Sequence, residues 1–236
     1  MKCLLSVCLI ALLAVAIGHV VEQSVNASQE SSAALQQGVS VTMVSASNAQ
    51  PMPEADNGDA WIITVTADGQ LYFGVDPLTP AALRERMIRT PRKRTQRLYI
   101  KADARASFAS VQKALSAASA AEIESPVLLV TRHISSKPGA MVAPEGLEIL
   151  IDEAANSGAK SVVEVNSAEG SSTVKVDDQE IPLADLHDRL SQLMKSRNGR
   201  MVFLRADAHS KFADVAHVID ACRAAGASVV VAAPVV

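Results

Sequence analysis

Aromatic residues are scarce in this chain of 236 residues, and charge of one dominant sign is lacking as well. Only 3% of the residues are aromatic whereas 49% are apolar, so Ala, Val, Leu and Ile must form most of the core. Small aliphatic side chains suit helices that pack closely on a sheet, and the chain is long enough for one or two domains. The net charge of -3 argues against a general nucleic-acid-binding protein, because that role usually needs a basic face.

Cysteine is also rare. Cys3 and Cys8 lie in a hydrophobic N-terminal stretch, which leaves Cys222 as the one thiol in the remainder of the sequence. One thiol cannot form an internal disulfide, and no Cys and His spacing is typical of a zinc site, so we expect no metal and no cofactor. The sequence also lacks a glycine-rich phosphate loop and a nucleophile elbow. We therefore predict no catalytic residues and a protein that is not an enzyme.

The N-terminal residues 1–21 are apolar apart from Lys2, Ser6 and His19. A run of roughly 19 apolar residues just reaches the length of a membrane-spanning helix. Lys2 before this run predicts that its start faces the cytoplasm and that the rest of the chain is exported. A cleaved signal peptide, with Ala-Val-Ala at 14–16 as its cleavage site, is the alternative. Both interpretations place the rest of the chain outside the cytoplasm.

Two segments are predicted to be linkers. Residues 22–60 are rich in Ser, Ala, Gln and Asn without sustained periodicity, which indicates a flexible tether. Apolar and polar residues alternate at 39–44, so a short strand within this tether is an alternative. Residues 133–160 form the second linker, and the apolar residues within 146–156 predict a short helix there.

An internal repeat occupies most of the remaining chain, as a first copy at 61–132 and a second copy at 161–236. The sequence Ile-Lys-Ala-Asp-Ala at 100–104 matches Leu-Arg-Ala-Asp-Ala at 204–208, and an aromatic residue follows each Asp at the same spacing. Such self-similarity indicates that each copy is one structural unit. We expect each copy to close its own hydrophobic interior.

The residue patterns predict the same order of elements, β-β-α-β-α-β, in both copies. In the first copy, alternation predicts strands at 62–66 and 70–75 around an Asp-Gly turn. Thr79 is predicted to cap the next helix, with Pro80 in its first turn, and Ser107 to cap the second helix. The predicted fold class is α/β (α+β): two tandem ββαβαβ modules, each a four-stranded mixed sheet with two helices, after one N-terminal hydrophobic helix.

Several motifs of the repeat occur together at fixed offsets. Ala-Asp-Gly at 67–69 is followed by a capped helix and then by the Asp-to-aromatic spacing, and the second copy ends in Ala-Gly-Ala and a β-branched run within 225–231. This combination resembles the periplasmic domain of the ExbD/TolR family over about two thirds of the chain. The resemblance implies a single-pass inner-membrane protein with periplasmic C-terminal domains. It also implies an ExbB- or TolQ-like membrane subunit and a TonB- or TolA-like or other envelope partner, and it leaves a homodimer open.

The function implied by this resemblance is that of an accessory component in a proton-motive-force-driven system for envelope transport or integrity. In that family an aspartate within the membrane helix handles the proton, whereas no Asp or Glu lies between Cys3 and Val21 here. His19 is the one ionisable residue in that stretch, and it lies near the end, where an interfacial residue is expected. An exported envelope-binding module without proton coupling is therefore the alternative.

Asp103 and Asp207 occupy corresponding positions at a predicted strand-to-helix turn. They are candidate partner-contact residues. The alternative is a turn residue whose carboxylate accepts hydrogen bonds from nearby backbone N–H groups. No base, nucleophile or metal ligand accompanies either Asp in the sequence, which favours the turn interpretation.

Seven basic residues and one acidic residue lie between Arg84 and Arg97. Arg92, Lys93 and Arg94 are the candidates within this basic segment for contact with an anionic lipid, an envelope polymer or an acidic partner. The alternative is a solvated helix end, where cations also suit the helix dipole.

Overall fold

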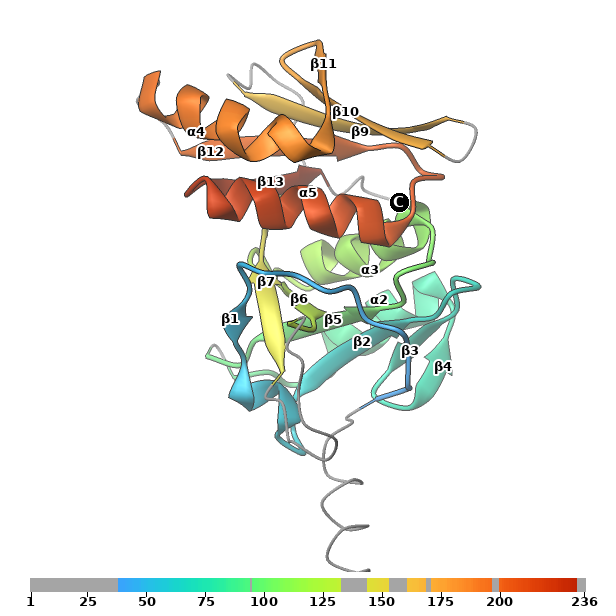
Figure 1. Cartoon of the computed structure of the whole chain (residues 1–236). Coiled ribbons are helices and arrows are strands. Elements are labelled where there is room, and N and C mark those ends of the chain that lie inside the picture. Colours follow the sequence, from blue (N-terminus) through green and yellow to red (C-terminus); the bar gives the residue numbers. More distant parts are fainter. Residues whose placement is uncertain are drawn as a thin grey trace, which may run out of the picture. The chain divides into compact units, whose positions relative to one another are not determined.

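Two mixed β-sheets, each with two helices, form the fold (Figure 1). The computed structural model describes residues 38–93, 95–132, 144–152, 161–168, 171–196 and 200–232. The predicted N-terminal hydrophobic helix lies outside these residues. Within the described ranges, no helix is both long and apolar enough to span a bilayer.

The first sheet contains seven strands in the order β1-β7-β6-β5-β2-β3-β4. They are β1 (Gln50–Pro51), β2 (Trp61–Val65), β3 (Leu71–Phe73), β4 (Asp76–Leu78), β5 (Leu98–Ala102), β6 (Val127–Val130) and β7 (Glu145–Glu148). Helix α2 (Pro80–Arg89) precedes β5, and helix α3 (Phe108–Ala120) connects β5 to β6. A short 3-10 helix, η1 (Pro53–Asp56), follows β1.

The second sheet contains six strands in the order β11-β10-β9-β12-β13-β8. They are β8 (Leu150–Asp152), β9 (Val162–Ala168), β10 (Ser171–Val176), β11 (Gln179–Ile181), β12 (Met201–Ala206) and β13 (Ser228–Ala232). A 3-10 turn, η2 (Leu183–Asp185), leads into helix α4 (Leu186–Ser196), and helix α5 (Phe212–Ala224) connects β12 to β13.

The two copies share one strand connectivity, as the repeat predicts. In the first sheet β2 pairs antiparallel with β3 and parallel with β5, which pairs parallel with β6. In the second sheet β9, β10, β12 and β13 pair in the same way. The predicted fold class is confirmed for these four strands and two helices of each copy.

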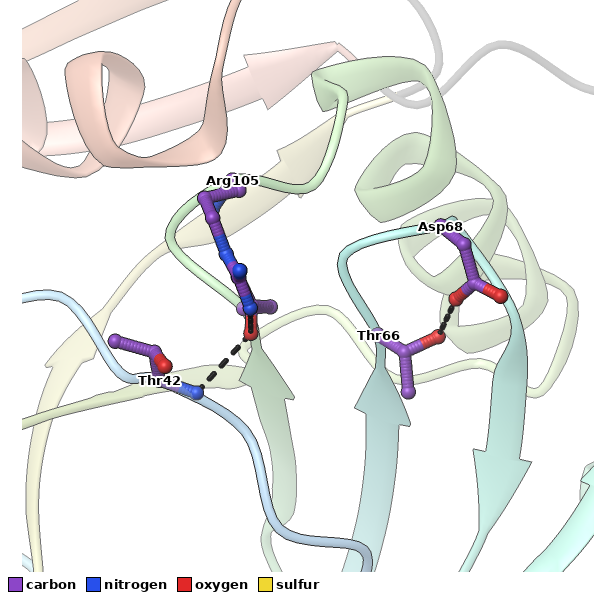
Figure 2. A network of polar contacts seen from close by, with 5 residues as sticks. Thr42, Thr66, Asp68 and Arg105 are labelled. Carbon is purple, nitrogen blue, oxygen red and sulfur yellow. Dashed lines mark hydrogen bonds and ion pairs between the residues drawn. The ribbon is translucent and has the colours of Figure 1, made fainter.

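Local sequence explains the starts of these elements. The Thr79 hydroxyl accepts a hydrogen bond from a backbone N–H in the first turn of α2, which confirms the predicted cap. Gly69 lies at φ +82° in the turn between β2 and β3, a conformation that glycine adopts at little cost. The Thr66 hydroxyl donates to the Asp68 carboxylate in the same turn (Figure 2). The predicted strand 70–75 instead ends at Phe73, because Gly74 turns the chain into β4.

The helix predicted within 146–156 is wrong for the residues that the structure describes there, since β7 and β8 occupy them. Leu147 and Ile149 are both buried and two positions apart, which is the period of a strand. Gly146 lets β7 pack closely, because a Cβ there would overlap Val127 on β6. The segment between the copies therefore adds β7 beside β6 in the first sheet and β8 at the edge of the second sheet.

The flexible tether predicted for 22–60 is also wrong over residues 38–60, which we call the N-terminal arm. Val44, Ala46 and Ala49 of the arm are buried in the main core. Farther along, Met52 and Ala55 cover the face of the first sheet that carries Ile62, Tyr99, Val127 and Leu129. The arm is thus an integral part of the first sheet's packing, whereas residues 22–37 lie outside the described ranges.

The expectation that each copy closes its own hydrophobic interior is wrong as well. Buried apolar residues of both copies belong to one contiguous cluster. Helices α3 and α5, one from each copy, contact each other, and this contact joins the two interiors. The copies therefore share a core although their sheets are separate.

Candidate functional site

Asp103 directly follows β5, and its carboxylate binds the loop that leads into α3. Its carboxylate accepts hydrogen bonds from the backbone N–H groups of Thr42 at 3.1 Å and Arg105 at 3.0 Å, and from the Arg105 guanidinium at 2.9 and 3.1 Å. Figure 2 shows Thr42 on the N-terminal arm, close to the loop that carries Arg105. The side-chain hydrogen bonds from Arg105 hold the pKa of Asp103 at about 2, and only 3% of the residue is exposed.

Asp207 occupies the equivalent turn after β12, but its carboxylate has fewer described hydrogen bonds than that of Asp103. Its carboxylate accepts from the backbone N–H of His209 at 2.7 Å and lies 3.2 Å from the His209 ring nitrogen. These contacts, the backbone hydrogen bond first, lower the pKa of Asp207. Both aspartates therefore act as turn residues within the described contacts. Their direct contact with a partner stays a prediction.

The two loops that these aspartates shape are bound to each other. The N–H groups of Phe108 and Ala109 donate to the carbonyls of Ser210 and Ala208 at 2.8 and 3.0 Å. The N–H groups of Phe212 and Ala213 donate in return to the carbonyls of Ala106 and Ala104 at 2.8 and 3.0 Å. Ser107 and Lys211 form an antiparallel bridge between the two loops.

Each bond from the first copy to the second has an equivalent bond from the second copy to the first, at the matching positions of the repeat. The two loops are therefore related locally by a pseudo-two-fold axis. The first N–H groups of a helix have no partner within the helix. Here each copy supplies carbonyl acceptors to the second helix of the other. Ser107 accordingly makes no side-chain cap bond, although it occupies the predicted cap position.

The N-terminal arm connects the two copies at a second place. Its Thr42 carbonyl accepts from Ala104, and its residues Val44 and Ala46 exchange backbone hydrogen bonds with Thr131 after β6. The next two residues cross to the second copy, where the Asp220 carboxylate on α5 accepts from the backbone N–H groups of Ser47 and Asn48 at 3.0 and 2.8 Å. Asp220 could not be recognised from the repeat, since Ser116 occupies the matching position in α3.

The basic segment is less available to an anion than its composition indicates. Arg86 pairs with Asp76 at 3.8 Å, and Arg89 pairs with Glu85 at 2.6 Å. Arg92 is half-buried and donates to a backbone carbonyl at 2.8 Å. Lys93 is exposed, whereas Arg94 lies outside the described residues. Of the three predicted contact residues, Lys93 is the one that the structure presents as an exposed cation.

Shallow pockets of about 310 and 370 Å³ lie beside the basic segment and share Arg92 and Glu122. A further pocket of about 310 Å³ shares Arg97 and Glu148 with the first of these. Each of these pockets is lined by both carboxylates and guanidinium groups, so none presents charge of one sign. Within the described part of the chain, no cluster of His, Cys, Asp and Glu is suited to hold a metal ion.

Burial also shifts the pKa of Lys101 and of Cys222. Lys101 on β5 is 5% exposed under η1, and desolvation lowers its pKa, while the nearby Asp56 carboxylate opposes that effect. Burial raises the pKa of Cys222 to about 12, which makes this thiol unreactive. Neither group lines the pockets described above.

Comparison with known proteins adds a family assignment to this geometry. The sequence pattern that describes the family "biopolymer transport protein ExbD/TolR" matches residues 5–133 and, a second time, residues 135–234. The two matches together span more than half of the chain, and each contains one copy of the shared strand connectivity. No curated protein shows significant sequence similarity to the chain.

Proposed function

Because the chain belongs to the ExbD/TolR family of biopolymer transport proteins, we propose that it is an accessory component of a proton-motive-force-driven envelope system. In this proposal residues 1–21 anchor the chain in the inner membrane, and the two copies lie in the periplasm. The partners are an ExbB- or TolQ-like membrane subunit and a TonB- or TolA-like or other envelope protein. The protein acts by binding and not by catalysis.

The observation that supports this function best is the duplicated ββαβαβ unit, which the family pattern matches twice. The copies are joined side to side by reciprocal backbone hydrogen bonds and a common core. A paired unit with a packed interface is suited to transmit a movement from one partner to another, because packed interfaces shift between discrete arrangements.

Capture of the full-length protein from solubilised membranes tests this function. We expect a multi-pass ExbB-like protein to co-purify with it, and we expect that association to be lost when residues 2–21 are deleted. The deletion variant is the matched control, because it keeps every described residue. Recovery of the full-length chain from the membrane fraction without any multi-pass partner would contradict the proposal.

A second candidate is an exported envelope-binding module without proton coupling. It is favoured by one observation, the lack of Asp and Glu between Cys3 and Val21. The mass of the mature protein separates the two functions. An intact N-terminus in the membrane fraction supports the accessory component, whereas cleavage after Ala16 together with a soluble protein supports the exported module.

A further inference from the structure

Glu122, directly after the end of α3, has a left-handed backbone conformation at φ +57°. Gly226 occupies the equivalent position after α5, at φ +79°. In both copies the N–H of the following residue donates back to a helix carbonyl at 3.0 Å, so the two helices end in the same way. Helices usually end like this at glycine, because a Cβ atom is strained in the left-handed region. The first copy therefore has a glutamate where its own repeat has a glycine.

The charge of Glu122 is a second local cost. Its carboxylate is exposed and follows the C-terminal end of α3, which carries partial negative charge. Among the described residues, no ion pair or side-chain hydrogen bond engages this carboxylate. Asp177 and Asp178 also have positive φ, but they form the two-residue turn between β10 and β11, which requires that conformation. Glu122 thus combines backbone strain with an unfavourable charge, and such combinations are expected at functional sites.

Glu122 lines the pocket of about 370 Å³ described above, which has an apolar part and a polar part. Trp61 and Ile88 contribute to the apolar part, and Ile88 is 56% exposed. Helices α2 and α3 both end at this pocket, with Thr90 and Ala121 as their C-cap residues. The negative ends of two helix dipoles therefore lie beside the Glu122 carboxylate.

The two copies differ at this pocket. The parallel register of β2 with β5, and of β9 with β12, makes Ser161 the equivalent of Trp61. Gly226 is the equivalent of Glu122. Because the second copy has the same strand connectivity without either side chain, the shared fold requires neither Trp61 nor Glu122.

The surroundings of the pocket favour a cation. The pocket lies where β2 begins and α2 and α3 end, at the opposite end of the first sheet from the paired loops, so these loops leave it open. Arg92 donates to the Gln96 carbonyl at 2.8 Å, and Lys93 is exposed but lines none of the three pockets. Carboxylates outnumber guanidinium groups along the three adjoining pockets, which are lined by Glu54, Glu122, Glu124, Glu148, Arg92 and Arg97.

We propose that the pocket formed by Trp61, Ile88 and Glu122 binds a basic side chain of a protein partner together with a neighbouring apolar side chain. The Glu122 carboxylate pairs with the lysine or arginine, and the apolar side chain packs on Trp61 and Ile88. This inference rests on the proposed function, in which the chain acts by binding an envelope protein. It also explains why a glutamate occupies a strained position, since the partner contact requires a carboxylate there.

The fluorescence of Trp61 reports on the pocket in the full-length protein in detergent, because the chain contains one tryptophan. The probes are the N-acetylated peptide amides Leu-Lys-Leu and Leu-Glu-Leu, titrated into the millimolar range. We expect Leu-Lys-Leu to change the fluorescence to saturation. It should bind about two- to fivefold more tightly than Leu-Glu-Leu, which is the effect of one exposed ion pair.

Two substitutions of Glu122 separate its charge from its backbone strain. Glu122→Gln should weaken binding of Leu-Lys-Leu about two- to fivefold, because the ion pair is lost. Glu122→Gly should weaken binding to the same extent but lower the unfolding equilibrium constant in urea about fivefold, because it removes both local costs. Glu180→Gln is the matched control, since it removes an exposed carboxylate from β11 of the second copy. It should bind both peptides like the wild type.

Three outcomes would overturn this inference. The first is the lack of a saturable change with Leu-Lys-Leu, and the second is equal affinity of wild type and Glu122→Gln for that peptide. The third is a Glu122→Gly variant less stable than the wild type, which would show that the fold itself needs the glutamate. None of these results depends on co-purification of a multi-pass membrane protein, so failure of the pocket is distinguishable from failure of the proposed function.

Discussion

Replacing Asp103 by Asn should destabilise the protein strongly for a single isosteric change. The carboxylate is 3% exposed, and its pKa falls from an ordinary 3.8 to about 2, chiefly through the Arg105 hydrogen bonds. That depression corresponds to roughly 2 kcal/mol of stability at neutral pH. Arg105 is 70% exposed, so solvent screens part of the interaction. The Asn amide nitrogen would in turn face the Thr42 N–H, which adds an unsatisfied donor, and we expect a total loss of about 2 kcal/mol.

Urea unfolding of the full-length protein at two pH values measures this loss. A carboxyl group whose pKa is lowered in the folded state stabilises that state above its unfolded pKa. The stabilisation is lost as the pH falls from about 4 toward 2. The difference in unfolding free energy between wild type and Asp103→Asn should therefore shrink by about half between pH 7 and pH 3. Asp207→Asn is the matched control, and it should cost clearly less, because His209 is its one side-chain partner and is 93% exposed.

Equal losses in the two variants at pH 7 would refute this reasoning. They would mean that the turn conformation, which both aspartates share, determines stability and that the buried contacts of Asp103 with Arg105 and Thr42 contribute nothing. A difference that does not change with pH would refute the electrostatic part alone.

Three further predictions use the same unfolding measurement or a labelling rate. Thr79→Ala should cost about 1 kcal/mol through loss of its cap bond, whereas Ser107→Ala should cost much less, because the other copy binds the first N–H groups of α3. Gly146→Ala should cost roughly 1–3 kcal/mol through overlap with the neighbouring strand, whereas Gly58→Ala, with open space around it, should be close to neutral. Cys222 should react with a thiol reagent at the rate of unfolding, because it is fully buried and its pKa is raised to about 12; fast labelling of the folded protein would contradict its burial.

Periodicity and turn chemistry predicted the repeated part of the fold because those signals are local. The Asp-Gly turn before β3, the Thr79 cap and the apolar stripes of α3 and α5 each depend on residues a few positions apart. The three strands outside the repeated unit were missed for the opposite reason. β1, β7 and β8 contain two to four residues each and are strands because distant segments pair with them. Such pairing leaves no periodic pattern in so short a segment.

The candidate site was predicted only in part. The matching positions of Asp103 and Asp207 were visible from the repeat, and so was their role at a turn. The partners of these side chains were not, since Thr42 lies 61 positions before Asp103 and belongs to a segment whose composition indicates a flexible tether. The contact between Asp220 and Asn48 joins residues 172 positions apart. Composition also overstated how much positive charge the basic segment offers to a partner. The ion pairs of Arg86 and Arg89 reduce it, and they depend on the folded geometry.

The shared core and the reciprocal hydrogen bonds contribute differently to the joining of the copies. If the copies separated, water would replace the carbonyl acceptors at the helix ends, so the reciprocal hydrogen bonds contribute little net stability. Separation would also expose apolar surface around Ala106 and Phe212, which are fully buried, and each square ångström of it costs about 25 cal/mol. The apolar contacts therefore hold the copies together, whereas the reciprocal hydrogen bonds fix which residues of the two loops face each other.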